Sequence, residues 1–267
     1  MSEINTPGKR PVLYTTRLRR DFGGVVAVNN VDFLAYPGEI SGLIGPNGAG
    51  KTTLFNNITG MDSPSSGHVH FRDREITGSP AHTISRLGIG RTFQNIRLFK
   101  DMTVLENVMV GRHFQQTHSS SKGLRSLNAI LSILLMKKEE KETYSHAMRW
   151  LEFCKLDKMA NEFARNLPYG KQRELEIARA LATEPSLLFL DEPAAGMNPQ
   201  ETDDLMLTIR NIQQAKITIV LIEHDMKLVM NICDRITVMN YGKKIAEGSP
   251  SEIRQNPEVI QAYLGTD

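Results

Sequence analysis

Short apolar runs separated by turns occupy the first part of the chain. Runs at 13–19 and 25–33 predict two strands joined by the turn at 22–24, which is an antiparallel beginning. A third apolar run, at 40–44, leads into a glycine-rich loop, and a helix is predicted after it, at 52–59. The pattern therefore predicts a loop held between a short buried strand and a helix.

Helical periodicity dominates the middle of the chain. A strand at 68–71, a helix that begins near Pro80 and a strand at 90–93 come first. Between 103 and 163 the apolar positions follow helical spacing, interrupted by the polar segment 117–123, which is predicted to be flexible. This stretch indicates a helical subdomain.

Helices and strands alternate after Gly170. Predicted helices at 173–183 and 200–214 alternate with apolar strands at 187–190 and 217–222. Such alternation indicates a parallel sheet with crossover helices. Together with the antiparallel beginning, it predicts an α/β fold with a mixed or parallel sheet.

Composition and charge narrow the class of protein. The 267 residues are 40% hydrophobic, which is enough to bury a large core. The 32 basic and 30 acidic residues nearly cancel, so no global field favours nucleic acid or anionic lipid. No apolar stretch approaches the roughly 20 residues that span a bilayer, and the first ten residues lack the apolar core of a secretion signal. With Cys154 and Cys233 as the only cysteines, we expect a reducing cytosol, and membrane association only through partner proteins.

The glycine-rich loop has the composition of a phosphate-binding loop. It matches G-x-x-x-x-G-K-[ST] with Gly45, Pro46, Asn47, Gly48, Ala49, Gly50, Lys51 and Thr52. Its backbone N–H groups and the positive end of the following helix suit phosphate oxygens. We expect Lys51 to bridge the β- and γ-phosphates, the Thr52 hydroxyl to bind Mg²⁺, and Thr53 to belong to the same nucleotide-binding set. The loop predicts a P-loop NTPase core that binds ATP or GTP.

Two adjacent carboxylates follow the apolar strand at 187–190. Parallel strands end beside the phosphate loop, so Asp191 is placed to hold the magnesium shell. Glu192 is placed to orient and deprotonate an attacking water, a contribution typically worth ~10²–10⁴ in rate. Pro193 ends the strand and fixes the direction of the pair. The alternative is a solvated strand end.

Two further polar residues follow apolar strands. His224 comes after the strand at 217–222, where it can hydrogen-bond a γ-phosphate. Gln94 follows the strand at 90–93, and its amide oxygen can reach Mg²⁺ or water. The alternatives are a structural histidine and a surface glutamine. Catalytic roles for both depend on their position relative to the acid pair.

In this order the motifs resemble the ATP-binding subunits of ABC transporters, over nearly the whole chain from Val12 to Gly265. The resemblance implies that Phe22 stacks on adenine, that Gln94 belongs to the Q-loop, and that His224 is the switch histidine. It also implies a D-loop that ends at Asn198 and a signature segment, formed by Leu167, Pro168, Tyr169, Gly170 and Lys171. The family works as a head-to-tail dimer, in which each ATP lies between the phosphate loop of one subunit and the signature of the other.

Within the family, four segments look like the branched-chain amino-acid importers: 91–99, 192–199, 222–226 and 259–265. The resemblance implies a peripheral subunit on the cytoplasmic face of the membrane that uses ATP and Mg²⁺. Its partners would be two transmembrane permeases, an extracytoplasmic binding protein that delivers Leu, Ile and Val, and a second ATPase that is a second copy or a paralogue. No nucleic-acid partner is expected. The nearest alternatives are the ATPase of a urea importer or of a lipopolysaccharide exporter.

The signature departs from the family pattern Leu-Ser-Gly-Gly-Gln, because only Leu167 and Gly170 match it. Pro168 lacks a hydroxyl and a backbone N–H that would face the γ-phosphate. Lys171 places a cation near a helix N-terminus, against the macrodipole, and we hypothesise that it faces the partner's ATP. A solvated lysine is the alternative. Asn198 replaces the usual D-loop aspartate, which keeps an acceptor and removes a charge.

The predicted organisation is a P-loop NTPase core, an N-terminal antiparallel β subdomain and an inserted α-helical subdomain. The ranges are a flexible tail at 1–10 and a single ATPase domain at 11–267, with core at 11–94 and 168–249, helical subdomain at 95–167 and C-terminal helical tail at 250–267. Two other classes compete: a soluble ABC protein of DNA repair or translation, and a regulator without turnover. The sequence shows neither a long coiled coil nor a second ATPase domain, and Glu192 and His224 favour turnover.

Overall fold

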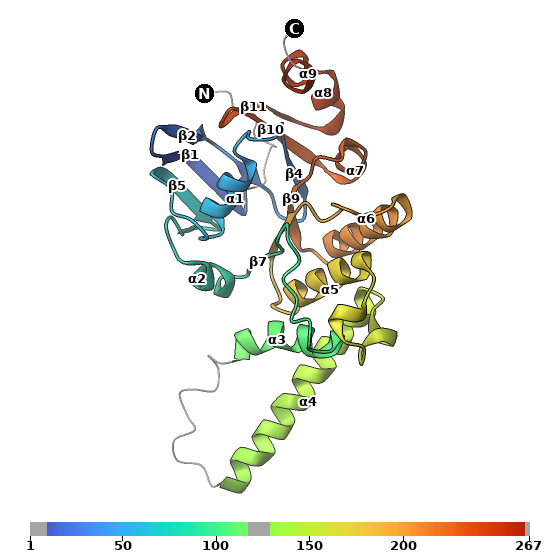
Figure 1. Cartoon of the computed structure of the whole chain (residues 1–267). Helices are drawn as coiled ribbons and strands as arrows, with labels where there is room; N and C mark the ends of the chain where they lie inside the picture. The colour runs from blue at the N-terminus through green and yellow to red at the C-terminus, as the bar shows by residue number, and fades with distance from the viewer. Residues whose placement is uncertain (1–9, 117–128, 265–267) are drawn as a thin grey trace.

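Two sheets and a set of helices make up the computed structural model, which describes residues 10–116 and 129–264 (Figure 1). The strands are β1 (Leu13–Phe22), β2 (Val25–Val31), β3 (Leu34–Ala35), β4 (Ile40–Ile44), β5 (Ser66–Phe71), β6 (Arg74–Glu75), β7 (Ile89–Arg91), β8 (Leu187–Asp191), β9 (Thr218–Ile222), β10 (Arg235–Asn240) and β11 (Lys243–Gly248). The helices are α1 (Lys51–Ile58), α2 (Ala81–Arg86), α3 (Val104–Gln116), α4 (Ala129–Phe153), α5 (Tyr169–Leu181), α6 (Pro199–Gln214), α7 (Met226–Ile232), α8 (Pro250–Gln255) and α9 (Pro257–Leu264). Short 3-10 helices are η2 (Asp157–Met159) and η3 (Ala164–Asn166).

The larger sheet has the order β11-β10-β4-β9-β8-β7, and its pairs are parallel except for β10 with β11. Strands β4, β8 and β9 are buried along their whole length, because both faces of the sheet are covered. Along β8, Leu188 and Leu190 join the core that includes α5 and α6, whereas Leu187 and Phe189 join the core that includes α1. The parallel strands end at one edge, which brings the loops after them together.

The smaller sheet is antiparallel and packs with α1. Its order is β2-β1-β5-β6, with β3 paired to β1. Val28 and Val69 of this sheet share one core with Phe55 of α1. The Phe55 ring in turn meets Phe189 of β8 edge-on, with 4.8 Å between the ring centroids. Helix α1, which follows the phosphate loop, is therefore fixed between the two sheets.

Helices α3, α4 and α5 lie together beyond the end of the large sheet (Figure 1). The fully buried Val108, Leu151 and Leu175, one from each helix, belong to a single core there. Of the helices in the described ranges, none is long and apolar enough to span a bilayer. The predicted tail before Arg10 and the predicted flexible segment 117–123 lie outside the described residues.

The α/β fold with a mixed sheet and an antiparallel beginning is confirmed, and two local differences have physical causes. Helix α5 begins at Tyr169, four residues before the predicted start, with Pro168 as its N-cap residue. The hairpin β10–β11 was not predicted. Its turn, Tyr241-Gly242, has positive φ at both positions, a geometry that sequence reasoning looks for in Asn-Gly or Asp-Gly.

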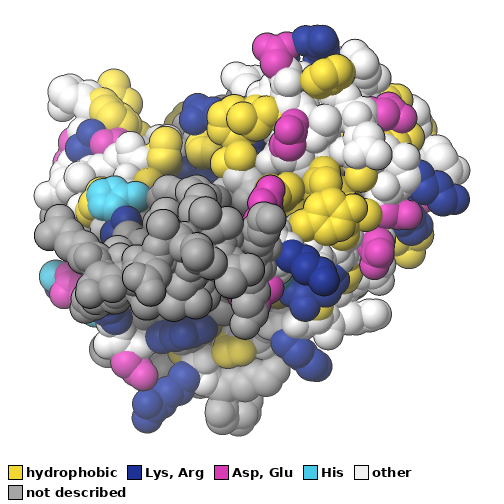
Figure 2. Space-filling model, turned by 90° about the horizontal axis from the view of Figure 1, so that it is seen from below, with side chains coloured by type: hydrophobic (Ala, Val, Ile, Leu, Met, Phe, Trp, Pro, Cys, Tyr) yellow, Lys and Arg dark blue, Asp and Glu magenta, His cyan; other side chains and the backbone are white. Residues whose placement is uncertain are grey.

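Basic and acidic side chains are interspersed on the described part of the face seen from below (Figure 2). Hydrophobic side chains lie among them, and no single sign of charge dominates this described surface. The view agrees with the formal net charge of +2, which gives no broad field for attracting a polyanion.

Candidate active site

The phosphate loop follows β4, and the backbones of neighbouring segments approach two of its glycines closely. At Gly45, with φ 149°, a Cβ would lie 2.1 Å from the backbone oxygen of Met239. At Gly50, with φ 97°, a Cβ would lie 2.2 Å from the backbone oxygen of Ala27. Both positions therefore require glycine, for conformation and for space.

Lys51 begins α1 and folds back across the loop. Its ammonium donates hydrogen bonds to the carbonyl oxygens of Gly45 at 2.7 Å and Pro46 at 3.0 Å. Burial lowers the pKa of Lys51, and the carboxylates of Glu192 and Asp191 oppose that shift. The ammonium is thus held over the loop, where phosphate oxygens would replace the carbonyl oxygens as its partners.

A hollow of about 460 Å³ opens over the loop. It is lined by Val25, Val26, Ala27, Asn47, Gly48, Ala49, Gly50, Lys51, Thr52, Thr53, Gln94, Glu192, Tyr241 and Gly242. The structure therefore brings most of the predicted phosphate loop into one space with Gln94 of the predicted Q-loop and Glu192 of the acid pair, whereas Asp191 is not among the described residues that line it.

Of two exposed aromatic residues, Phe22 and Tyr241, only Tyr241 is among the described residues that line this hollow. Phe22, at the end of β1, is 47% exposed and is not among the described residues that line the hollow; the Arg20 guanidinium lies 4.5 Å from its ring centroid. Tyr241, in the turn after β10, does line the hollow and is 86% exposed. Sequence reasoning missed Tyr241, because an aromatic residue in an unpredicted hairpin turn carries no recognisable signal.

Asp191 is buried against Arg91 at the end of β8. The Arg91 Nη2 and Asp191 Oδ2 atoms are 3.0 Å apart, and the two side chains are only 9% and 4% exposed. Arg91 also donates from Nη1 to the Thr59 hydroxyl at 2.6 Å, which ties the ion pair to the end of α1. Burial raises the pKa of Asp191, and Arg91 opposes this. The role of Arg91 was missed, since nothing in the sequence places its side chain beside Asp191.

The three predicted catalytic side chains lie together: Gln94 and Glu192 line the hollow, and His224 lies beside Glu192. Gln94 donates from Nε2 to Glu192 Oε2 at 2.8 Å. His224 Nδ1 lies 3.9 Å from the same carboxylate oxygen. Glu192 itself has φ 46°, and its backbone N–H donates to the Ile222 carbonyl oxygen at 3.0 Å, so the acid is held in a left-handed turn against the end of β9.

Glu223 is fully buried next to these residues and holds the backbone around them. Its carboxylate accepts hydrogen bonds from the backbone N–H groups of Ala194 at 2.8 Å, His224 at 3.1 Å and Asp225 at 3.5 Å. Burial raises the pKa of Glu223, while these donors lower it. Glu223 thus joins the loop after Glu192 to the loop that carries His224. Its position after an apolar strand was the available signal for this role.

The predicted signature residues form the start of α5. Leu167 is buried, Pro168 occupies the N-cap position without a side-chain capping bond, and Tyr169, Gly170 and Lys171 lie in the first turn. The Lys171 ammonium pairs with Glu174 Oε2 at 2.7 Å, three residues along the helix. The local anion opposite this lysine is therefore Glu174 in the single chain.

Asn198 lies beside the signature and caps α6. Its side chain accepts from the Glu201 N–H at 3.0 Å, and Glu201 accepts from the Asn198 N–H at 2.9 Å, a complete capping box. A Cβ on Gly170 would lie 2.7 Å from the Glu201 carboxylate, so the signature packs closely on this cap. The predicted signature and D-loop residues therefore form a second cluster, next to the start of α6.

Comparison with known proteins identifies the family of this chain. The family model described as ABC transporter matches residues 28–195. The chain belongs to the ABC transporter family. This ABC cassette is 49% identical over 259 residues to the high-affinity branched-chain amino acid transport ATP-binding protein LivG of Escherichia coli (strain K12), covering 96% of this chain and 98% of LivG. It is 47% identical to the corresponding protein BraF of Pseudomonas aeruginosa, with the same coverage.

Solved ABC cassettes have the same fold. A nucleotide-free ATP-binding cassette from an ABC transporter gives a TM-score of 0.82 at 32% identity, over 96% of this chain and 100% of that chain. The ADP conformation of an ATP-binding cassette gives the same TM-score and coverage at 31% identity. The predicted P-loop NTPase fold is confirmed. As an ABC ATPase, the protein binds nucleotide and couples ATP hydrolysis to transport.

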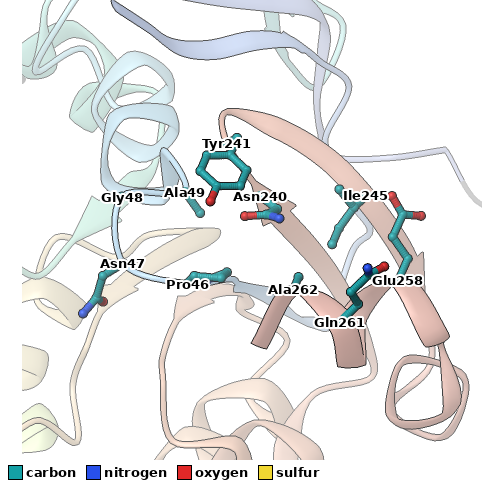
Figure 3. A pocket seen from close by; sticks show the side chains of 10 residues that line it. All are labelled: Pro46, Asn47, Gly48, Ala49, Asn240, Tyr241, Ile245, Glu258, Gln261 and Ala262. Carbon is teal, nitrogen blue, oxygen red and sulfur yellow. The ribbon is translucent and has the colours of Figure 1, made fainter. Parts of the chain in front are cut away.

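The C-terminal part of this ABC cassette reaches the phosphate loop. A second model, described as branched-chain amino acid ATP-binding cassette transporter, matches residues 243–267. Figure 3 shows Gln261 of α9 across a pocket of about 310 Å³ from Pro46 and Ala49. Burial raises the pKa of Tyr263 on α9, and a hydrogen bond from the Gly45 N–H opposes that shift. Helix α9 therefore lies next to the phosphate loop.

Proposed function

We propose that this chain is the ATP-hydrolysing subunit of a binding-protein-dependent importer of branched-chain amino acids. The observation that supports hydrolysis is the hydrogen bond from Gln94 to Glu192, which holds a carboxylate over the phosphate-loop hollow with His224 beside it. The proposed cargo rests on the names of LivG and BraF and on the second family model.

Each catalytic side chain has a proposed task. Glu192 accepts the proton of the attacking water, and Gln94 orients the Glu192 carboxylate through its amide nitrogen. His224, with a side chain that is 61% exposed, is free to turn toward the γ-phosphate. Lys51 binds the β- and γ-phosphates, and the open face of Phe22 stacks on the adenine.

Mg²⁺ is the proposed cation of this site. Thr52, Gln94 and Asp191 carry hydroxyl, amide and carboxylate oxygens, which are the hard donors that Mg²⁺ prefers. Thr52 and Gln94 line the hollow, whereas Asp191 is paired with Arg91 beside it. Because the amide nitrogen of Gln94 donates to Glu192, its amide oxygen is left to act as a ligand. The residues present therefore fit the ion. When bound, Mg²⁺ supplies positive charge that offsets the negative charge of the phosphates.

The proposed assembly pairs two ATPase subunits head to tail on two transmembrane permeases, at the cytoplasmic face of the membrane. The second ATPase is another copy of this chain or a paralogue, and a binding protein delivers the amino acid outside. In this arrangement residues 167–171 and Asn198 face the ATP of the partner subunit. Their clustering at the start of α5 and α6 supports a single surface offered to the partner.

Reconstitution tests this function directly. The chain is co-purified with its permeases in detergent, every chain is identified, and the complex is placed in liposomes with the binding protein. We expect ATP-dependent uptake of leucine, isoleucine and valine. Glu192→Gln should keep ATP binding and lower hydrolysis by ~10²–10⁴. Uptake of urea instead would contradict the proposed cargo, and undiminished turnover of Glu192→Gln would refute the catalytic assignment.

A further inference from the structure

Arg173 connects two loops that lie far apart in the sequence. Its side chain is 3% exposed and donates from Nη1 to the Phe93 carbonyl oxygen at 2.8 Å. Its Nη2 donates to the Gln94 carbonyl oxygen and to the Tyr169 hydroxyl, the latter at 3.0 Å. The planar fork of arginine suits such parallel contacts, which lysine cannot reproduce. Arg173 therefore holds the Q-loop backbone and the signature at once.

Tyr169 extends this connection to the D-loop. Gly196, with φ 79°, faces the Tyr169 ring so closely that a Cβ there would lie 3.2 Å from the ring atom Cε1. The Arg173 guanidinium lies 5.5 Å from the centroid of the same ring. The tyrosine, which is 44% exposed, thus contacts both Arg173 and the loop that follows Glu192.

A continuous set of contacts results. Glu192 accepts from the Gln94 side chain, the Gln94 carbonyl accepts from Arg173, and the Tyr169 hydroxyl accepts from Arg173. One end of this set lies in the hollow of the subunit's own phosphate loop. The other end is the signature, which the proposed function assigns to the partner's ATP.

We propose that Arg173 and Tyr169 are positioning residues that couple the nucleotide state of one composite site to the signature offered to the other. The inference rests on the proposed two-site assembly. Nucleotide that shifts Gln94 moves the carbonyl held by Arg173, and the Arg173 fork moves Tyr169 with it. The departure of Tyr169 from the family signature then has a physical role, since a glycine at that position has no hydroxyl to accept from Arg173.

Tyr169→Phe tests the proposal by removing one hydroxyl and keeping the ring against Gly196. In the assembled transporter we expect kcat to fall roughly three- to tenfold, as for loss of one hydrogen bond, and the Hill coefficient for ATP to fall toward one. The ATP dissociation constant of the isolated subunit should stay unchanged. Arg173→Lys should lower kcat further. Tyr169→Phe should lower kcat less in the Arg173→Lys background than in the wild-type protein, because both changes break the same contact.

The matched control is Tyr36→Phe, since Tyr36 is a buried tyrosine with the Arg235 guanidinium 4.9 Å from its ring centroid, outside the site. It should leave the Hill coefficient at the wild-type value. A wild-type kcat and Hill coefficient in Tyr169→Phe would overturn the inference, as would equal losses in both tyrosine variants. A wild-type complex without ATP turnover would instead overturn the proposed function.

Discussion

The buried ion pair between Arg91 and Asp191 fixes the position of the Asp191 carboxylate at the end of β8. Arg91 reaches from β7 to Asp191 of β8 and to Thr59 at the end of α1, so one guanidinium fixes three elements. Both charges are nearly inaccessible to water, and a partner lost from such a pair leaves the other charge unpaired in the interior.

Arg91→Met should therefore destabilise the fold by about 3–5 kcal/mol, the cost typical of breaking a buried pair from one side. Urea unfolding of the isolated subunit measures it. The control is Arg19→Met, which breaks a 2.9 Å pair with Asp21 in which both side chains are 32% exposed, and this should cost about 0–1 kcal/mol. Equal losses in the two variants would show that the Arg91 pair contributes no more than a surface contact.

The Lys171 ammonium has two candidate partners, Glu174 in its own chain and the ATP of the partner subunit. If it faces the partner's ATP, Lys171→Gln should lower turnover of the assembled transporter by about ten- to a hundredfold, since hydrogen bonds to charged groups are worth about 1.5–3 kcal/mol. ATP affinity of the isolated subunit should not change. Glu174→Gln is the matched control, because it removes the 2.7 Å partner and keeps the lysine. Unchanged turnover in Lys171→Gln would leave only the local pairing with Glu174.

Single residues also show what the sequence could reveal about the site. The proximity of Gln94, Glu192 and His224 was predictable, because each follows an apolar strand and parallel strands end at one edge. The contacts of Arg91 and Arg173 were not predictable, because their partners are a carboxylate and carbonyl oxygens about 80–100 positions away, and no local pattern encodes such contacts.

Among the elements, helix α6 is capped by a residue that has an observed folding role and a proposed role in assembly. Asn198 caps α6 in a capping box with Glu201, and the proposed function also places it against the ATP of the partner subunit. A cap acts within the isolated chain, whereas a contact with a partner's nucleotide acts only in the assembly. The two roles can therefore be separated by measurement.

Asn198→Ala should lower the free energy of unfolding by about 1 kcal/mol, the usual cost of losing an N-cap. Asn198→Asp should keep the cap and the stability, because aspartate is an equally good N-cap residue and suits the helix dipole. Ser249→Ala, at the capping box of α8 away from the signature, is the control for cap loss alone. We measure unfolding of the isolated subunit and ATP turnover of the complex. Full stability of Asn198→Ala would contradict the capping role.

Elements with a clear apolar pattern were predictable, and elements that depend on pairing with a neighbouring strand were not. The buried strands β4, β8 and β9 are continuous apolar runs, and their observed bounds differ from the predicted ones by one residue at most. The strand β11 is mostly polar and, among the described strands, pairs only with β10, through a turn with Tyr241 where Asn or Asp is usual. Its place at the edge of the sheet follows from that pairing, which local pattern does not specify.

At the scale of the whole molecule, the two cysteines report on opening of two different regions. Cys154 follows α4 in the helical part, and Cys233 lies under β4, where its Sγ would be 2.9 Å from a Cβ on Gly42. Burial raises the pKa of each thiol to about 12, so each keeps its proton at neutral pH and is shielded from reagents. Reaction of either thiol therefore requires local or global unfolding.

We expect both thiols to react with a disulfide reagent far more slowly in the native protein than in urea, and Mg-ATP to slow the reaction further. A ligand that binds only the folded state stabilises it by RT ln(1 + [L]/Kd), about 2.7 kcal/mol at one hundred times Kd, which is about a hundredfold in the rate set by global opening. Cys154→Ser and Cys233→Ser each leave one reporter. If ATP protects Cys233 and leaves Cys154 unchanged, the helical part opens separately from the nucleotide-binding core; equal protection shows one cooperative unit. Fast labelling at neutral pH without urea would contradict the burial of both side chains.

The same thiols predict how stability depends on pH. An unfolded thiol titrates near 9 and a folded one near 12, so the unfolded state loses its thiol protons first. The free energy of unfolding must therefore fall as the pH rises between these values.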